Sequence, residues 1–385
     1  MKKKKNRFRR ISKLIAVIFL IIAVVLIASK FKKKDLKSIG YNKEEIAIIE
    51  KLSDEEIETI KQHKYTKYID DILNSGEYNK HKLDKYLTYI EKYNKVDCVK
   101  IVKLINNEDF KEKQVDDYMK LLEDYDNVTG VILYVNEFKD KFELDSTTLN
   151  ILGGKYFIKD YIDRYIAYYK EHSDLSADEI ITRINANLDY EFYTDSKPAD
   201  LSKGMYTLVN KYNHLSSDYV PNNLVQVDRR FTHNNTKVVD VANDAFVKLA
   251  EEGEKNGVHF LATTCYRDYN FQSILYNNYV RNDGVANADT YSARPGSSEH
   301  QLGYSLDLTN TSYVDFDNFV YTDEYKWLKD NAHKFGFILR YPEGKEYITG
   351  YIFEPWHIRY VGEDIAKYIY ENNITYEEYY AYFIR

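Results

Sequence analysis

Apolar residues recur at intervals of three and four along residues 38–190, for example in the segments 44–49 and 55–60. That spacing places them on one face of an α-helix. Proline is absent from the whole stretch, and Ser53 is followed three residues later by Glu56, which is the pattern of a capping box at a helix start. We therefore predict that residues 38–190 form an all-helical region.

A weak repeat runs through this helical region. Each of three segments begins with a tyrosine and ends with an asparagine, over spans of 20, 18 and 20 residues: Tyr86 to Asn106, Tyr118 to Asn136, and Tyr165 to Asn185. One interpretation is a series of helix–turn–helix repeats that stack to bury a shared face. The other is three ordinary amphipathic helix pairs. With either interpretation the region is a spacer to which we assign no chemistry.

Composition changes near residues 193–200. All five prolines lie at or beyond Pro198, and most of the glycines follow it. Short runs rich in β-forming residues then alternate with helical patterns, a mixture that predicts an α+β domain over residues 195–385. The predicted strands are 224–227 and 258–262, and the predicted helices are 241–252 and 272–282.

The first 37 residues differ from the rest. Residues 1–13 form a basic tail, and residues 14–29 carry no charge. As a helix the uncharged stretch would span roughly 24 Å, slightly less than a bilayer core, and the flanking Lys13 and Lys30 could extend to the interface. We predict a transmembrane anchor, with a cleaved signal peptide as the alternative.

Orientation follows from the basic residues on either side of this stretch, eight before it and five after it. The excess before it predicts that the N-terminus stays inside and that the bulk of the chain lies outside.

The two cysteines, Cys98 and Cys265, are far apart and are expected to be buried apolar residues. Such low cysteine use outside the cell favours a bacterial protein over a disulfide-stapled eukaryotic secreted one.

Charge is distributed unevenly along the chain. Residues 1–37 carry +12, and the remaining residues carry −19, for a total of −7. An acidic body of this size repels phosphate backbones, so nucleic acid is excluded as an expected partner. The basic tail instead suits anionic lipid at a membrane surface.

Two short segments carry the candidate chemistry. His300 and Asp307 lie six residues apart, with Gly303 between them, and His357 lies near the C-terminus. A turn at Gly303 followed by a strand would let His300 and Asp307 converge, and His357 would join them on folding. Two imidazoles, one carboxylate and an open position are typical of a catalytic zinc site.

Other polar residues near these segments have candidate roles. Glu354 precedes His357 by three residues, and the intervening Pro355 disfavours a helix, so the carboxylate is predicted to act as a general base from a loop or a strand end. Arg267 follows a strand-like run and could hold a developing oxyanion. Candidate neutral hydrogen-bond partners of a substrate are Gln272, Ser297 and Ser298.

The pattern Ser-x-His-x-x-Gly-x-x-x-Asp, followed by Glu-x-Trp-His-x-Arg-Tyr, resembles the zinc D-alanyl-D-alanine carboxypeptidases of the VanY type. The upstream pattern Tyr-Arg-x-Tyr-x-x-Gln, at residues 266–272, also fits. The resemblance covers about residues 195–385. It implies a fold like that of hedgehog domains and D-Ala-D-Ala peptidases, with a small antiparallel sheet flanked by helices.

The resemblance also implies roles for individual residues. His300, Asp307 and His357 would be the zinc ligands, Glu354 the catalytic base, and Arg267 a contact of the scissile carbonyl. Tyr266 joins the predicted substrate-binding residues. The implied partners are peptidoglycan stem peptides, and the implied reaction is removal of their C-terminal D-Ala. The alternatives are an L,D-carboxypeptidase or an endopeptidase acting on the same polymer, and a zinc-bearing binding or sensor protein without turnover.

Overall fold

The computed structural model describes residues 35–194 and 196–385. The predicted basic tail, residues 1–13, and the predicted anchor, residues 14–29, lie outside the described residues. Within the described ranges, no helix combines the length and the apolar character needed to cross a membrane. The chain divides into two compact units, Met1–Phe157 and Ile158–Arg385.

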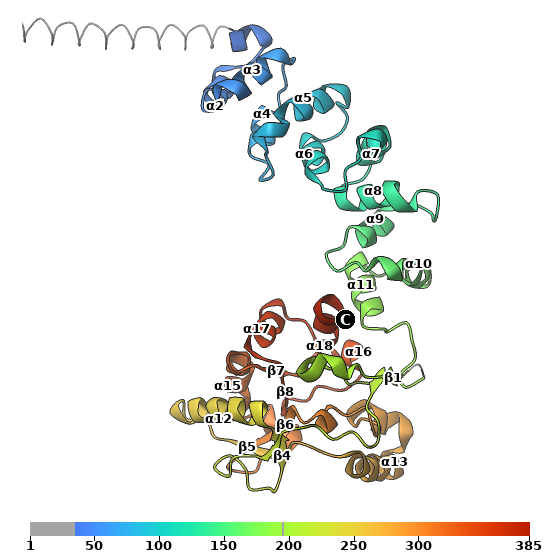
Figure 1. Ribbon diagram of the computed structural model, residues 1–385, viewed down its shortest axis with the longest axis vertical. Helices are drawn as coiled ribbons and strands as arrows, with labels where there is room; N and C mark the ends of the chain where they lie inside the picture. Colours follow the sequence, from blue (N-terminus) through green and yellow to red (C-terminus); the bar gives the residue numbers. More distant parts are fainter. Residues whose placement is uncertain (1–34, 195) are drawn as a thin grey trace, which may run out of the picture. The chain divides into compact units, whose positions relative to one another are not determined.

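The described part of the first unit is helical (Figure 1). Ser53 and Glu56 form the predicted capping box at the start of α3, with reciprocal side-chain-to-backbone hydrogen bonds. The helices are α2 (Lys43–Ile49), α3 (Asp54–Gln62), α4 (Ile69–Leu73), α5 (Leu83–Lys92), α6 (Cys98–Asn106), α7 (Val115–Leu122), α8 (Val128–Leu133) and α9 (Ser146–Leu152), with shorter turns η1 (Lys80–Lys82), η2 (Glu112–Gln114) and η3 (Tyr134–Phe138).

A hydrogen bond joins each tyrosine of the weak repeat to the asparagine that ends the same segment. The tyrosine hydroxyl donates to the asparagine Oδ1 in all three pairs, at 2.7 Å from Tyr86, 2.5 Å from Tyr118 and 2.5 Å from Tyr165. Two of these asparagines also donate to a preceding backbone carbonyl, Asn106 to Glu77 and Asn136 to Asp109. The recurring tyrosine and asparagine therefore share a structural role in fastening the two helices of each pair.

The second unit begins with the last helix pair of the repeat, α10 (Ile162–Glu171) and α11 (Ala177–Asn185). The domain boundary predicted from the sequence, near residues 190–195, differs from this division after Phe157, and it stays a prediction. Side chains of α11 contact the C-terminal part of this unit: the Thr182 hydroxyl lies 3.4 Å from the Tyr382 hydroxyl, and the Arg183 guanidinium lies over the Tyr347 ring. These contacts explain why the pair groups with the second unit.

The rest of the second unit is an α+β domain, as predicted. Its elements, all after α11, are β1 (Lys197–Pro198), η5 (Leu201–Tyr206), β2 (Asn213–His214), β3 (Leu224–Gln226), β4 (Lys237–Val239), α12 (Asp240–Lys255), β5 (Phe260–Thr264), α13 (Tyr269–Tyr291), η6 (Glu299–Leu302), β6 (Ser305–Asn310), α14 (Phe316–Phe319), α15 (Asp323–Asn331), η7 (Ala332–Phe335), β7 (Phe337–Leu339), α16 (Glu346–Thr349), β8 (His357–Tyr360), α17 (Glu363–Asn372), α18 (Tyr376–Tyr379) and η8 (Tyr380–Ile384); the short turn η4 (Lys159–Tyr161) precedes α10.

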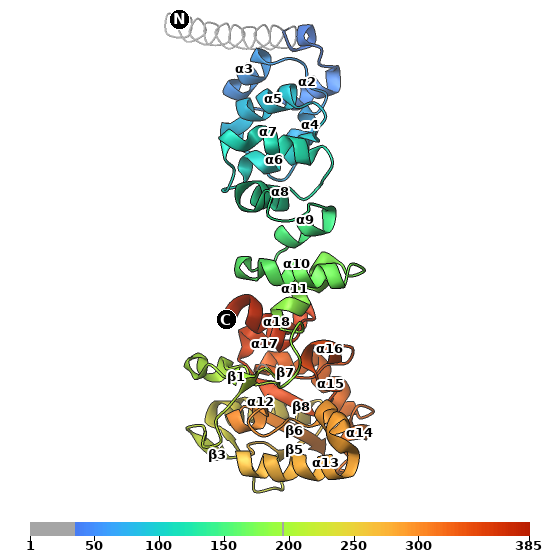
Figure 2. The same cartoon turned by 90° about the vertical axis from the view of Figure 1, so that its right-hand side faces the viewer.

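A four-stranded antiparallel sheet lies at the centre of this domain, in the order β5-β6-β8-β7. Figures 1 and 2 show the sheet among α12, α13, α15 and α17. Every residue of β6 is buried, because the strand is covered on both faces. Leu306 and Leu308 of β6 pack with Phe246 and Leu249 of α12 in the main core. This buried central strand is a rigid support for the side chains that it carries.

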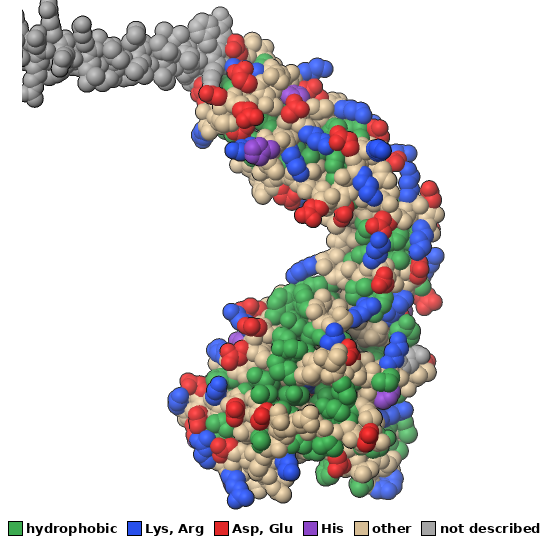
Figure 3. Space-filling view, viewed as in Figure 1, with side chains coloured by type: hydrophobic (Ala, Val, Ile, Leu, Met, Phe, Trp, Pro, Cys, Tyr) green, Lys and Arg blue, Asp and Glu red, His purple; other side chains and the backbone are tan. Residues whose placement is uncertain are grey.

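The surfaces of the two units differ in character. Figure 3 shows basic and acidic side chains interspersed over the first unit, whereas the visible face of the second carries a broad area of hydrophobic side chains, with tyrosine counted among them.

Both cysteines are buried and free, as predicted.

Candidate active site

The central strands bring two of the predicted metal ligands together. In the antiparallel pairing of β6 with β8, Asp307 lies directly opposite His357. Side chains of such directly opposed residues project from the same face of the sheet, a few ångströms apart. Two residues that are 50 positions apart in the sequence thus become neighbours through strand register.

His300 reaches the same place through a tight turn. It lies in η6, and Gly303 follows in the left-handed conformation, with φ of 81°, before β6 begins. Glycine is favoured there by its positive φ, and a Cβ would also lie only 3.0 Å from side-chain atoms of Pro221 and Val239. The predicted turn at Gly303 and the following strand are confirmed.

The three side chains form one compact buried group. His300 Nε2 lies 3.3 Å from Asp307 Oδ2, and His357 Nδ1 lies 3.1 Å from Asp307 Oδ1. One ligand atom from each residue lies within 4.8 Å of the other two. Among the described residues, His300 Nε2 and Asp307 Oδ1 have no hydrogen-bond partner. Buried polar atoms without partners are costly, and a cation among them would satisfy them.

The surroundings keep His300 in the form that binds a metal. Its Nδ1 donates a hydrogen bond to the Cys265 carbonyl oxygen at 2.5 Å, so Nε2 is the nitrogen left with a lone pair. Burial and the positive charge of Arg267 lower the pKa of His300 to about 4. Burial alone would raise the pKa of Asp307, but its contacts with His300 and His357 hold it well below the ordinary value. Near neutral pH the group is therefore ready for a cation.

Glu354 lies beside this group without belonging to it. It is in the loop before β8, where its backbone N–H donates to the Tyr341 carbonyl and its Oε2 lies 3.5 Å from His357 Nδ1. Burial, with the nearby charge of Asp307, raises the pKa of Glu354 well above its ordinary value. A carboxyl group whose pKa is raised toward neutrality is suited to accept and return a proton.

Arg267 lies on the other side of Asp307. Its backbone N–H donates to the His300 carbonyl at 3.3 Å, which fixes the segment after β5 against η6. Its Nη1 contacts Asp307 Oδ2 at 3.3 Å. The guanidinium therefore borders the group of candidate ligands, where it can also donate to an oxygen of a bound molecule.

These residues line a cleft of about 590 Å³. Of the predicted neutral contacts, only Ser298 lies on its wall. Gln272 is buried behind the wall, where its Nε2 donates to the carbonyl of Ala293, itself a wall residue. Ser297 and Tyr266 also lie away from the wall, and their backbone N–H groups donate to the carbonyls of Arg294 and Lys237 respectively. Direct substrate contact by these three residues stays a prediction.

Much of the cleft wall carried no signal in the sequence. The rings of Phe316 and Trp356 stack with their centroids 4.9 Å apart, and several tyrosines and aspartates also line the cleft. Trp356 could have been predicted as a wall residue from its place in the motif. No single tyrosine could have been, because the chain has 39 of them. Besides Asp307, the tyrosines and aspartates of the wall are Tyr279, Asp283, Tyr291, Asp315, Asp317, Tyr341 and Tyr351.

Sequence reasoning also missed a set of buried charges behind the ligands. Glu299 and Arg359 lie within the two motifs, and both side chains are fully buried. A signal was present, because residues two apart on a strand share a face, so Arg359 must be buried with His357 if β8 is central.

The chain is similar in sequence to known proteins. Residues 235–363 match the VanY family model, described as D-alanyl-D-alanine carboxypeptidase. The protein YodJ of Bacillus subtilis (strain 168) is 36% identical over 206 residues, which cover 50% of this chain and 76% of YodJ. A D-alanyl-D-alanine carboxypeptidase of Enterococcus faecium is 40% identical over 138 residues, which cover 36% of this chain and 42% of that protein.

The chain is also similar to a solved structure, that of the LdcB LD-carboxypeptidase. The sequence identity is 38% and the TM-score 0.45, over 47% of this chain and 87% of the other. The extent of the match to YodJ, together with the family model, decides the assignment. This chain belongs to the VanY family of D-alanyl-D-alanine carboxypeptidases.

Proposed function

We propose that this protein is a zinc-dependent carboxypeptidase that removes the C-terminal D-Ala from peptidoglycan stem peptides. The observation that carries the proposal is the buried group of His300, Asp307 and His357, with Glu354 beside it. Two imidazoles and one carboxylate suit zinc better than the harder cations, which prefer oxygen ligands throughout. The atoms that bind the metal would be His300 Nε2, a carboxylate oxygen of Asp307 and His357 Nδ1.

Zinc in such a site supplies Lewis acidity, which lowers the pKa of a water molecule and polarises a carbonyl group. The oxygen of the attacking water would bond to the peptide carbonyl carbon, and Glu354 would accept the proton that this water loses. When the carbon–nitrogen bond breaks, Glu354 would pass that proton to the leaving amine of D-Ala. Its burial and its distance of 3.5 Å from His357 support this role.

Arg267 would stabilise the charge that develops on the carbonyl oxygen. Its guanidinium is fixed by Asp307 on one side and borders the cleft on the other. A preorganised donor of this kind is worth more in a site with little water than it would be in bulk solvent. The open cleft, about 590 Å³ in volume, has room for a peptide that remains attached to a polymer.

Defined stem peptides test the proposal. The full chain is incubated with zinc and either a pentapeptide ending in D-Ala-D-Ala or the matching tetrapeptide, and the products are weighed. We expect loss of one D-Ala from the pentapeptide, abolished by a chelator and restored by zinc. Loss of D-Ala from the tetrapeptide alone would replace the D,D assignment by an L,D one. Cleavage within cross-linked peptides would indicate an endopeptidase.

A pair of histidine variants tests the zinc site itself. H300A should lose both bound zinc and D-Ala release, because one of three ligands is removed. H259A is the matched control, since His259 is exposed and outside the cleft. Equal zinc content in the two variants would overturn the ligand assignment. Zinc binding by the parent without any peptide cleavage would favour a binding or sensor protein.

We also propose that the protein works at the outer face of a bacterial membrane, anchored by residues 14–29. The basic tail and the uncharged stretch support this location. Membrane fractionation of cells that produce the full chain would test it. Recovery of the protein in the soluble fraction, with residues 1–29 still present, would contradict the anchor.

A further inference from the structure

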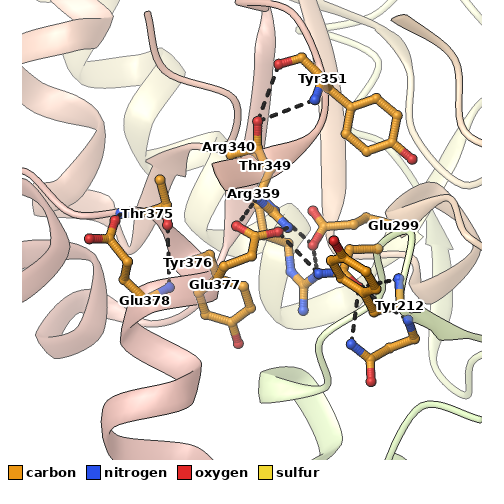
Figure 4. Close-up of polar contacts among 12 residues, drawn as sticks. Tyr212, Glu299, Arg340, Thr349, Tyr351, Arg359, Thr375, Tyr376, Glu377 and Glu378 are labelled. Atoms are coloured by element: carbon orange, nitrogen blue, oxygen red, sulfur yellow. Dashed lines mark hydrogen bonds and ion pairs between the residues drawn. The ribbon is translucent and has the colours of Figure 1, made fainter. Parts of the chain in front are cut away.

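Four charged side chains form a buried network behind the ligands: Glu299, Arg340, Arg359 and Glu377 (Figure 4). Each is at most 2% exposed. Arg340 joins the two carboxylates, because its Nε donates to Glu299 Oε1 at 2.9 Å and its Nη1 and Nη2 donate to the two oxygens of Glu377 at 2.9 and 2.6 Å. Arg359 Nη1 lies 3.1 Å from the same Glu299 oxygen.

The network connects four separate elements. Glu299 belongs to η6, Arg340 follows β7, Arg359 is in β8, and Glu377 is in α18. Its formal charge is zero, but each ion must still be removed from water. Buried ion pairs seldom stabilise a fold more than apolar residues of similar size would. Such a network is therefore better suited to fixing how these elements are arranged than to stabilising the fold.

The network lies against the candidate metal ligands. Glu299 immediately precedes His300, and Arg359 shares a face of β8 with His357. The second oxygen of Glu299, Oε2, lies 4.0 Å from His357 Nε2, which has no hydrogen-bond partner among the described residues. The other ring nitrogen, Nδ1, faces Asp307 and Glu354.

We propose that Glu299 is a positioning residue for His357, and that α18 becomes part of the site through Glu377. A carboxylate beside Nε2 favours the tautomer with its proton on that nitrogen, which leaves the Nδ1 lone pair for a metal. The two arginines hold Glu299 in place, and Glu377 holds Arg340 in turn. The inference rests on the proposed function, since it assumes that zinc binds His357.

The chain offers a matched pair of glutamates for the test. Glu377 and Glu378 are adjacent on α18, and both are buried, at 2% and 5% exposed. The Glu378 carboxylate accepts from the Thr375 backbone N–H at 2.7 Å and so closes the cap of its own helix. Figure 4 shows Glu378 with Thr375, and Glu377 with Arg340. E377Q therefore breaks the network, whereas E378Q disturbs only the helix start.

Zinc affinity is the main measurement. The full chain and its variants are stripped of metal and titrated with zinc against a chromogenic chelator, while circular dichroism and thermal unfolding report on the fold. We expect E299Q to weaken zinc binding by roughly 10- to 100-fold with unchanged secondary structure, the range found for residues that orient metal ligands. E377Q should weaken it less, and E378Q should lower the melting temperature without changing the affinity.

The tautomer of His357 is the second measurement. Nitrogen chemical shifts of its imidazole, in the metal-free protein, should show the proton on Nε2 in the parent and a shift toward Nδ1 in E299Q. Unchanged shifts together with unchanged zinc affinity in E299Q would overturn the proposal. If E299Q does not fold, E377Q carries the test, and equal effects of E377Q and E378Q on affinity would show that α18 acts only through folding.

The outcomes separate this inference from the proposed function. A parent that binds zinc but releases no D-Ala would overturn the proposed function and leave the positioning role standing. An active parent whose E299Q variant binds zinc equally well, with unchanged nitrogen shifts, would overturn only the positioning role. A parent that binds no zinc would overturn both.

Discussion

The helical repeat and the active site both rely on buried polar side chains, but they assemble them over different distances in the sequence. In the repeat, Tyr86 pairs with Asn106 and Tyr118 with Asn136, over 20 and 18 residues. In the site, Arg267 reaches Asp307 over 40 residues and Arg340 reaches Glu299 over 41. One helix, a turn and a second helix suffice for the first kind of contact, whereas the second kind needs the whole sheet.

This difference has a consequence for mutation. A contact made within one helix pair should affect mainly the stability of its own region. A contact made across the sheet should affect chemistry as well as stability, because the same strands hold the candidate ligands. The following predictions test that separation, from the largest expected effect to the smallest.

The largest effect is expected for the candidate base. E354Q should lower kcat by about 10²- to 10⁴-fold, because the amide cannot accept the proton of the attacking water. Bound zinc should remain equal to that of the parent, since Glu354 is not a candidate ligand. E343Q changes an exposed glutamate in the loop after β7 and should keep full activity. An E354Q variant with parental kcat would mean that another group takes the proton.

The same variant should also change how stability depends on pH in the metal-free protein. Because the folded pKa of Glu354 is raised, the stability that it contributes is present at low pH and is lost as pH rises through that pKa. E354Q should therefore be more stable than the parent near pH 7, and the difference should shrink as pH falls toward about 4.5, the ordinary value. Thermal unfolding of both proteins in chelator, across this range, measures the effect. A constant difference would contradict the raised pKa.

In the repeat, Y118F should reduce stability and leave chemistry intact. The Tyr118 hydroxyl donates to Asn136 Oδ1, lies 3.0 Å from Gln114 Oε1 and accepts from the Lys111 backbone N–H. Its loss should lower the free energy of unfolding by about 1–2 kcal/mol. Y321F, at a tyrosine that is 77% exposed, should cost nothing measurable. A change in kcat for Y118F would show that the helical region communicates with the site.

The smallest effect is expected at the capping box. S53A removes the side-chain oxygen that accepts from the Glu56 backbone N–H, and should cost about 1 kcal/mol of stability in denaturant unfolding. T59A, in the interior of the same helix, should be neutral or slightly stabilising, because alanine has the higher helix propensity. Equal losses for the two variants would mean that the cap contributes nothing beyond the helix itself.

Some elements were predictable because their signals are local. The capping box needs only residues three apart, and the turn at Gly303 needs only one residue that tolerates a positive φ. The ends of longer elements were less predictable. The helix predicted over 272–282 begins earlier, at Tyr269, since Asp268 caps its start, and Gly284, with φ of 77°, divides α13 (Tyr269–Tyr291) into two helical segments close to the predicted end. Caps and packing, rather than periodicity, decided these ends.

The amino-acid sequence by itself determined the helical period of residues 38–190, the two motifs and the identities of the three candidate ligands, because each depends on residue type and short spacing. Only the tertiary structure decided that Asp307 lies opposite His357, that Gln272 lies behind the cleft wall, and that Glu299 reaches Glu377 through Arg340. Strand register and buried ion pairs join residues far apart in the chain. Their partners are chosen by which elements pack together, which no local pattern specifies.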